Sequence, residues 1–346
     1  MKKNTYTSEI NFFKEKSFFI TNTYILVGHR CEFEKKGDYK TIDFFEKSIA
    51  IYKFKEKISA FTNKCAHRGC KIFNKAKGNS AFVCPYHAWS YDNSGRVKNI
   101  PFEKKAFKID KTRIKLEEWA LEFCGDFIFL KSKINKISLK KFLGKEFDQL
   151  LKTSKNIQKC IDYQVYKWGA NWQICVENSI DEYHAIFLHK TTFKNVLKLE
   201  PKYEIKNNVM KMKMPLSKNY IEKFKKIKNY FNNLNNTYMH TLFFPYSSIS
   251  STMGNSYYIQ NYLPKDIHNT NVTSTIYLPK SKLKKNPVIE KFFSNTCIKF
   301  NHEIFNEDKD ICESIYSNVR NDNSKKDIIG NLEFRIKSFR KKLGKI

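Results

Sequence analysis

The sequence predicts an α+β protein in which an all-β unit precedes a mixed unit that ends on a long helix. Short β-type runs bounded by turn residues follow one another from residue 23 onward, at Thr23–Gly28, Asp38–Asp43, Ser48–Lys53 and Ile58–Thr62. Near the other end of the chain, Ile289–Val319 carries apolar residues at helical spacing. With 346 residues, 41% of them hydrophobic, the chain is long enough to bury two cores.

These elements divide the chain into four predicted segments. Residues 1–20 are predicted as a lead-in with a short helix, 21–132 as the all-β domain, 133–160 as a linker with a helix, and 161–346 as the second domain. In the second domain we expect a helix, two strand regions and a basic helix solvated at the surface, at Trp172–Lys190, Lys202–Met214, Asn255–Leu278 and Arg335–Lys345.

The formal net charge of +30 raises the question of a nucleic-acid or membrane partner. The lysines are spread along the whole chain rather than gathered in basic blocks, so neither partner is predicted. No run of eighteen or more apolar residues is present, and the first residues lack the apolar core of a secretory signal. The nine cysteines are an odd number, which favours a reducing compartment and metal ligation over disulfides. We therefore expect a cytoplasmic protein.

A first group of metal ligands is expected in two short segments of the all-β unit. Cys65-Ala-His67 and Cys84-Pro-Tyr-His87 each offer one thiolate and one imidazole, with sixteen residues between His67 and Cys84. Two Cys and two His can close a zinc site or hold a Rieske [2Fe–2S] cluster. Zinc fingers pair Cys with Cys and His with His, whereas here each segment carries one of each. This spacing favours the iron–sulfur cluster.

A second group is expected around residue 185. His184 and His189 are five positions apart, so they converge on one metal ion only if the helix ends or distorts between them. A carboxylate from elsewhere would complete a two-histidine, one-carboxylate triad, which leaves open positions on ferrous iron. Two nearby histidines alone are more often ordinary residues on a helix face.

The surrounding residues resemble the large subunits of Rieske non-haem iron ring-hydroxylating oxygenases. Those proteins carry CxHRG and CPYHGW strings followed by a Tyr-Asp…Gly-Arg turn, and this chain has Cys65-Ala-His67-Arg-Gly, Cys84-Pro-Tyr-His87-Ala-Trp and Tyr91-Asp-Asn-Ser-Gly-Arg96. Ala88 stands where the family has glycine. The string from Asn171 to His189 resembles the family pattern N-W…E-N…D/E-x-Y-H-x4-H. The resemblance covers nearly the whole chain and is weakest at residues 200–240.

The resemblance implies a role for each matching residue. Cys65, His67, Cys84 and His87 would hold the [2Fe–2S] cluster, and His184 and His189 would bind the mononuclear iron. Asp181 matches the acid that bridges the two metal centres. The segment from Glu307 to Tyr316 resembles the stretch that supplies the third iron ligand. The match favours Asp308 over Asp310, although Tyr316 replaces the usual glutamine.

The resemblance also implies the fold and the activity. The catalytic domain would adopt a helix-grip (START-like) fold, an antiparallel sheet over a long C-terminal helix. Electrons from NAD(P)H would arrive through a separate reductase or ferredoxin, and Fe(II) would activate O2 to hydroxylate, dihydroxylate or oxidatively demethylate a small organic substrate. A homotrimer is expected, with or without a small β subunit, in which Asp181 lies between the centres of neighbouring chains. The alternative is a Rieske electron-transfer protein, which would need no second histidine pair.

Overall fold

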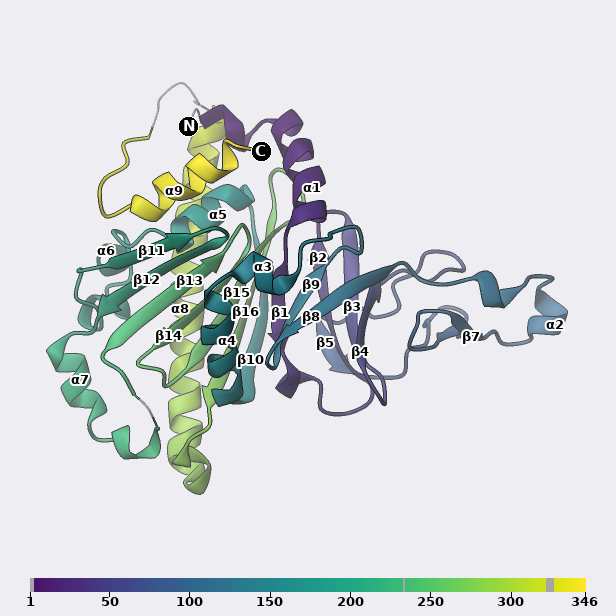
Figure 1. The fold of residues 1–346 in the computed structure, drawn as a ribbon, viewed down its shortest axis with the longest axis horizontal. Helices are drawn as coiled ribbons and strands as arrows, with labels where there is room; N and C mark the ends of the chain where they lie inside the picture. Colours follow the sequence, from purple (N-terminus) through teal and green to yellow (C-terminus); the bar gives the residue numbers. More distant parts are fainter. Residues whose placement is uncertain (1–2, 233, 322–326) are drawn as a thin grey trace.

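The computed structural model describes residues 3–232, 234–321 and 327–346, in which two seven-stranded antiparallel sheets lie side by side (Figure 1). The first sheet has the strand order β1 (Ile25–His29), β9 (Phe127–Lys131), β8 (Glu118–Cys124), β4 (Ile58–Thr62), β3 (Lys47–Lys53), β2 (Asp38–Phe44) and β5 (Lys77–Asn79). A ribbon of β6 (Ser90–Tyr91) and β7 (Val97–Asn99), followed by α2 (Glu103–Ala106), extends away from this sheet to the far end of the molecule (Figure 1). We call this end the tip.

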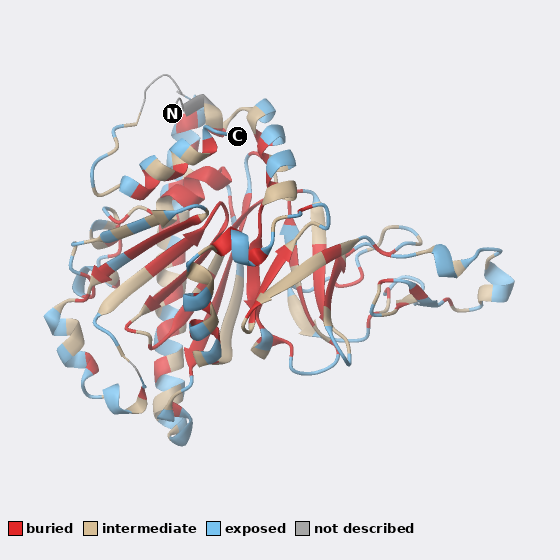
Figure 2. Ribbon diagram, in the orientation of Figure 1, coloured by how far each residue is buried: buried red, intermediate tan, exposed pale blue. Residues whose placement is uncertain are grey.

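The second sheet follows the first along the chain and forms the larger half of the molecule. Its order is β10 (Ile157–Trp168), β16 (Thr270–Pro279), β15 (Tyr257–Pro264), β14 (Ser247–Thr252), β13 (Thr237–Phe243), β12 (Val209–Pro215) and β11 (Lys202–Lys206). Every residue of β16 is buried, because this strand is flanked by two others and covered on its faces. Buried residues accordingly concentrate in the middle strands and thin out toward the tip (Figure 2).

The helices pack around the second sheet and its junction with the first. They are α1 (Glu9–Asn22), α3 (Leu139–Leu143), α4 (Glu146–Asn156), α5 (Trp172–Ser179), α6 (Ala185–Leu188), α7 (Lys218–Phe224), α8 (Pro287–Asn321) and α9 (Phe334–Leu343). The α8 helix crosses the second sheet against β10 and β16 and also contacts α5 (Figure 1). The predicted α+β class is confirmed, with a β-rich N-terminal part, an antiparallel sheet and a long C-terminal helix. The four segment boundaries stay predictions.

The buried stripe of α8 differs from the purely apolar one that its sequence indicates. Its buried residues recur every three or four positions, as expected for one helix face, at Phe293, Cys297, Asn301, Phe305, Asp308, Cys312, Tyr316 and Val319. The apolar side chains of Phe292, Ile311 and Ile315 are exposed. Two polar residues, Asn301 and Asp308, therefore face the interior where an apolar pattern would place none.

Two expected helices differ from the structure. The helix expected over Trp172–Lys190 is broken, with α5 ending at Ser179 and α6 beginning at Ala185. The C-terminal basic helix, expected to be solvated, is instead packed into the core through one face. Phe339 is fully buried, and its ring lies 6.0 Å from that of Trp172 in α5. The arginine at its start, Arg335, is 1% exposed.

A buried charge cluster joins the two sheets. Glu32, between β1 and β2, accepts hydrogen bonds from Lys40 at 2.9 Å and Lys77 at 3.0 Å, and also from the hydroxyl of Tyr277 in β16. Burial by itself raises the pKa of Glu32, but the two lysines outweigh it and lower the pKa to about 2. The Tyr277 hydroxyl thereby ties this cluster of the first sheet to the second sheet.

Among the described helices, none is both long and apolar enough to cross a bilayer.

Candidate metal centres

The predicted cluster ligands lie on two similar loops at the tip. In the first loop, Gly69 N–H donates to the Cys65 carbonyl at 2.9 Å, and in the second, Ala88 N–H donates to the Cys84 carbonyl at 3.0 Å. Each loop closes a tight turn directly after its cysteine. The two cysteines are thereby buried, at 4% and 2% exposure, while each turn carries its histidine outward.

The four predicted ligands pair across these loops, cysteine with cysteine and histidine with histidine. The Nδ1 atoms of His67 and His87 face each other at 3.2 Å, which leaves the Nε2 side of each ring directed away from the pair. Burial raises the pKa of the Cys65 thiol, and the adjacent Cys84 thiol acts in the same direction. A metal centre between these groups would reverse that effect by stabilising the thiolate. Two thiols and two facing imidazole nitrogens therefore fit a Rieske cluster.

Tyr91 and Ala88 add features that the sequence did not reveal. The Tyr91 hydroxyl accepts from the Ala66 N–H at 3.0 Å, so its own hydrogen is free to reach Cys65 Sγ, also at 3.0 Å. Hydrogen bonds to a ligating sulfur tune the cluster potential. Ala88, where the resembling family has glycine, has a φ of 54°. This left-handed conformation costs a non-glycine residue about 1–2 kcal/mol, which is the physical reason for glycine there.

The second group is assembled by the break between α5 and α6. The chain leaves α5 at Ser179, and Asp181 Oδ1 then accepts from the N–H groups of Tyr183 at 2.8 Å and His184 at 3.3 Å. This turn starts the four-residue helix α6, which has His184 and His189 at its two ends. The break is what lets two histidines five positions apart turn toward one point.

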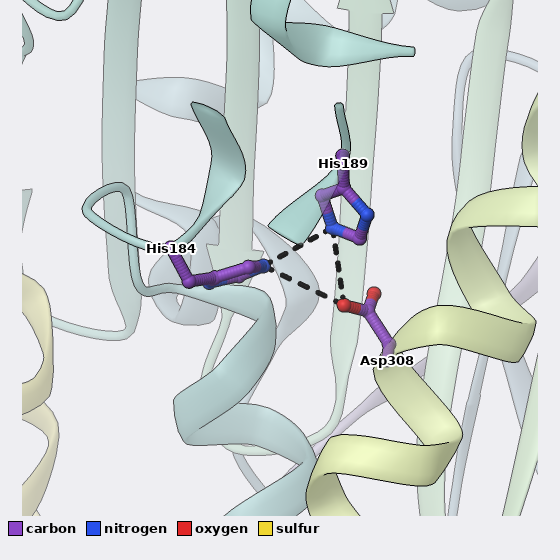
Figure 3. A group of neighbouring side chains, drawn as sticks. All are labelled: His184, His189 and Asp308. Carbon is purple, nitrogen blue, oxygen red and sulfur yellow. Dashed lines mark hydrogen bonds and ion pairs between the residues drawn. The ribbon is translucent and has the colours of Figure 1, made fainter. Parts of the chain in front are cut away.

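Figure 3 shows Asp308 of α8 meeting these two histidines. The two Nε2 atoms are 3.2 Å apart, and Asp308 Oδ1 lies 3.5 Å from His184 Nε2 and 3.1 Å from His189 Nε2. Ligand atoms about 2.1 Å from one metal ion and at right angles to each other would be about 3.0 Å apart. Among the described residues, these three are the only group of potential ligands whose ligand atoms all lie within 4.8 Å of one another. Asp310 is exposed and does not join them.

The charges around this group also fit a cation. Burial opposes ionisation of Asp308, but the two histidines outweigh it and hold its pKa below the usual range. Burial likewise opposes protonation of His184, yet Asp181 and Asp308 raise its pKa to about 10. Asp308 Oδ1 has no conventional hydrogen-bond partner among the described residues, although it is buried. A buried, unpaired carboxylate oxygen beside two imidazole nitrogens therefore fits a divalent cation held by all three groups.

Each histidine of this group has a carboxylate on its other side. Asp181 Oδ2 lies 3.6 Å from His184 Nδ1, and Glu307 Oε2 lies 2.6 Å from His189 Nδ1. A hydrogen-bonded acid such as Glu307 orients a ligating histidine and increases its basicity. The Asp181 contact is longer than a hydrogen bond. The contact of Glu307 was not foreseen, and the only sequence signal for it is its position next to Asp308.

A pocket with a cavity volume of about 90 Å³ opens over the three converging side chains. Its floor is the inner face of β12 to β15, and its other walls come from α8 and from the segment around Glu182. Arg335 of α9 also lines the pocket, and it donates to Glu182 and, at 2.8 Å, to His240 Nδ1. These three buried residues were not foreseen, since each comes from a different part of the chain.

Comparison with known families identifies both halves of the chain. Residues 23–119 match the Rieske [2Fe-2S] domain, and residues 159–346 match the catalytic domain of ring hydroxylating alpha subunits. The chain belongs to the ring-hydroxylating alpha subunits. The predicted family is thereby confirmed, and its two domains imply a [2Fe–2S] cluster and a mononuclear iron as cofactors.

Relatives in this family include aromatic dioxygenases. The chain is 31% identical over 193 residues to benzene 1,2-dioxygenase subunit alpha from Pseudomonas putida, covering 52% of this chain and 42% of the relative. It is 28% identical over 225 residues to the large oxygenase component of salicylate 5-hydroxylase from Ralstonia, covering 57% and 53%. The aligned part of the chain thus spans about half the length of these curated relatives.

Solved structures of low sequence identity share the fold. A quaternary ammonium Rieske monooxygenase in complex with L-carnitine superposes with a TM-score of 0.79 at 20% identity, covering 99% of this chain and 94% of that one. Naphthalene 1,2-dioxygenase bound to phenanthrene superposes with a TM-score of 0.76 at 18% identity, covering 94% and 81%. These likenesses establish the arrangement of the two sheets and the long helix.

Proposed function

We propose that this protein is the terminal oxygenase component of a Rieske-type system, which hydroxylates, dihydroxylates or oxidatively demethylates a small organic substrate. The observation that carries the proposal is the convergence of His184, His189 and Asp308 beneath a pocket, in the same chain as the Cys65–His67 and Cys84–His87 loops. A protein that only carries electrons needs the two cysteine–histidine loops but not the group of His184, His189 and Asp308. The mononuclear site is what distinguishes an oxygenase.

In this proposal each residue has a defined part. The four loop residues hold the cluster, which supplies single electrons, and the triad holds ferrous iron, which supplies O2 activation. Glu307 keeps His189 oriented through a 2.6 Å hydrogen bond to Nδ1, whereas Asp181 makes only a longer ionic contact of 3.6 Å with His184 Nδ1. The pocket holds the substrate beside the triad and limits the access of water. Hydroxylation of a C–H bond consumes O2, two electrons and two protons and releases water, so the electrons must come from a separate reductase or ferredoxin fed by NAD(P)H.

The proposed assembly is a homotrimer in which the tip of one chain reaches the catalytic site of the next. Within one chain, the tip and the α5–α6 segment lie at opposite ends of the molecule (Figure 1), which is unfavourable for electron transfer. Exposed aromatic side chains occur at both ends, at Tyr86 and Phe102 on the tip and at Tyr183 and Phe187 beside the triad. Exposed apolar groups of this kind favour burial in an interface. Asp181 would then bridge His184 and the neighbour's His87.

The charge of the chain supports an acidic electron donor. At +30, the chain would attract an acidic ferredoxin or reductase at long range and raise its association rate. Donor-dependent turnover should therefore fall as ionic strength rises, because salt screens exposed charges beyond about 8 Å at 0.15 M. Turnover that is independent of salt would argue against electrostatic docking.

The experiment combines metal analysis with a single turnover. The protein is purified anaerobically, reduced with dithionite, desalted and mixed with 18O2 and compounds named for its relatives, namely benzene, biphenyl, salicylate and L-carnitine. We expect a Rieske EPR signal, about three irons for two acid-labile sulfides, and 18O in an organic product. Asp308→Ala serves as the control that should lose the product and keep the signal. A Rieske signal with only about two irons and no labelled product would favour the electron-transfer alternative.

A further inference from the structure

The pocket over the triad contains buried hydrogen-bond donors that the protein itself does not satisfy. His240 in β13 and Asn301 in α8 both line this pocket, at 3% and 4% exposure. Neither His240 Nε2 nor Asn301 Nδ2 has a hydrogen-bond partner in the parts of the chain that the structure describes. Proteins pair nearly all of their buried polar groups, so unpaired donors in a pocket call for a ligand.

The neighbours of His240 determine where its proton lies. A guanidinium can only donate, so the Arg335 Nη1 contact of 2.8 Å makes His240 Nδ1 an acceptor. The ring proton must then be on Nε2, the unpaired atom. Arg335 also donates to Glu182, and this second hydrogen bond fixes the guanidinium in the position where it donates to His240. Burial and the charge of Arg335 also keep the pKa of His240 well below its ordinary value, which agrees with a neutral ring.

Asn301 presents a second donor from α8, which forms a wall of the pocket beside the sheet floor that carries His240. The Ser274 hydroxyl donates to Asn301 Oδ1 at 3.2 Å, which leaves the Nδ2 hydrogens directed elsewhere. Asn301 precedes Asp308 by seven residues, so the two share one face of α8 about 10 Å apart along its axis. The donor is therefore near the triad without being part of it. On the sheet floor, Ser250, Thr252 and Gln260 are polar pocket residues as well.

We propose that the pocket is built for a substrate that carries a carbonyl or carboxylate oxygen, received by His240 Nε2–H and Asn301 Nδ2–H. A plain hydrocarbon would seal both donors away from water without a partner, which disfavours its binding. A substrate oxygen satisfies them and turns the rest of the molecule toward the triad. This inference rests on the proposed function, because it assigns the substrate class of that same pocket.

Matched ligands test the inference on the iron-loaded protein. Binding is measured by calorimetry for acetophenone against α-methylstyrene and for cyclohexanone against methylenecyclohexane, pairs that differ only in C=O versus C=CH2. Benzoate and cyclohexanecarboxylate are measured as well, as negatively charged ligands with the same two ring types. We expect each oxygenated member to bind at least about tenfold tighter than its hydrocarbon partner. The comparison of ketone with carboxylate then decides which kind of oxygen the pocket takes.

Variants of the two donor residues test whether they cause the tighter binding of oxygenated ligands. Asn301→Leu and His240→Phe should each reduce the preference, whereas Asn306→Leu, on the exposed face of the same helix, should leave it unchanged. Equal or weaker binding of every oxygenated member, or a preference that survives in both pocket variants, would overturn the inference. Because binding needs no turnover, this failure differs from failure of the proposed function, which would appear as missing mononuclear iron or missing labelled product.

Discussion

Replacing Asp308 provides the sharpest test of the mononuclear site, because the neighbouring Asp310 is a built-in control. Asp308 Oδ1 is the only carboxylate oxygen within 3.5 Å of both histidine Nε2 atoms among the described residues, and its side chain is buried. Asp308→Ala removes one of three protein ligands and the negative charge that offsets the cation. Asp310→Ala removes an exposed acid on the same helix that contacts neither histidine.

The expected loss of iron affinity in Asp308→Ala follows from the number of ligands that the protein supplies. Loss of an outer carboxylate alone weakens metal binding by about 10–100-fold, so loss of a direct ligand should exceed about 100-fold. At ordinary iron concentrations the Asp308→Ala protein should then fall from about three irons per chain to about two, with sulfide unchanged at about two. Asp310→Ala should keep all three.

Iron and acid-labile sulfide analysis with EPR measures this outcome. An unchanged Rieske signal in Asp308→Ala would show that the protein is folded and that the loss is confined to the second site. Retention of about three irons in Asp308→Ala, or loss of one iron in Asp310→Ala instead, would refute the assignment of the third ligand.

Three further predictions address the residues around the two centres. Asp181→Asn should keep both metals but lower donor-dependent turnover by about 100-fold, measured beside iron and sulfide content. Glu307→Gln should weaken mononuclear iron about 10–100-fold by freeing the His189 ring, measured by chelator competition. Glu32→Gln should destabilise the fold by about 3–5 kcal/mol in urea at pH 7, because Lys40 is left buried without its counter-charge. The folded pKa of Glu32 is depressed from 4.5 to about 2, so its contribution is present above pH 4.5 and is lost as pH falls toward 2.

Each of these predictions has a clear contrary result. Full turnover of Asp181→Asn with intact metals would exclude the bridging role. Unchanged iron affinity in Glu307→Gln, with Glu303→Gln on the same helix as the control, would mean that His189 is held by packing alone. A destabilisation by Glu32→Gln that is as large at pH 3 as at pH 7 would mean that packing, rather than charge, accounts for the effect.

The cluster loops could be predicted from sequence because their geometry is local. Each pair of ligands, Cys65 with His67 and Cys84 with His87, is separated by one or two residues and lies within a turn closed by backbone hydrogen bonds. A ligand set of this kind is nearly determined by spacing. The alternating strands and the helix of 35 residues were likewise visible as periodic patterns.

Other features depended on contacts between distant segments. Periodicity indicates that α8 has one buried stripe, but it cannot say that Asn301 and Asp308 belong to it while Phe292 does not. That choice is made by the sheet and by the α5–α6 segment, which present polar partners to this face. The sequence predicts that the basic C-terminal helix is solvated at the surface. Arg335 is nevertheless buried, because Glu182 and His240 accept hydrogen bonds from its guanidinium.

Short-range spacing and periodicity in the sequence therefore indicated the β-rich first part, the long C-terminal helix and the paired residues of the two loops. The histidine pair stood out only through the resemblance to the family. The tertiary structure brought Asp308, which the resemblance favoured, against the two histidines. It alone decided which acid lies behind His189 and which buried donors of the pocket have no partner among the described residues. The physical reason is that a buried polar side chain is stabilised by its partners, and those partners come from segments that only folding brings together.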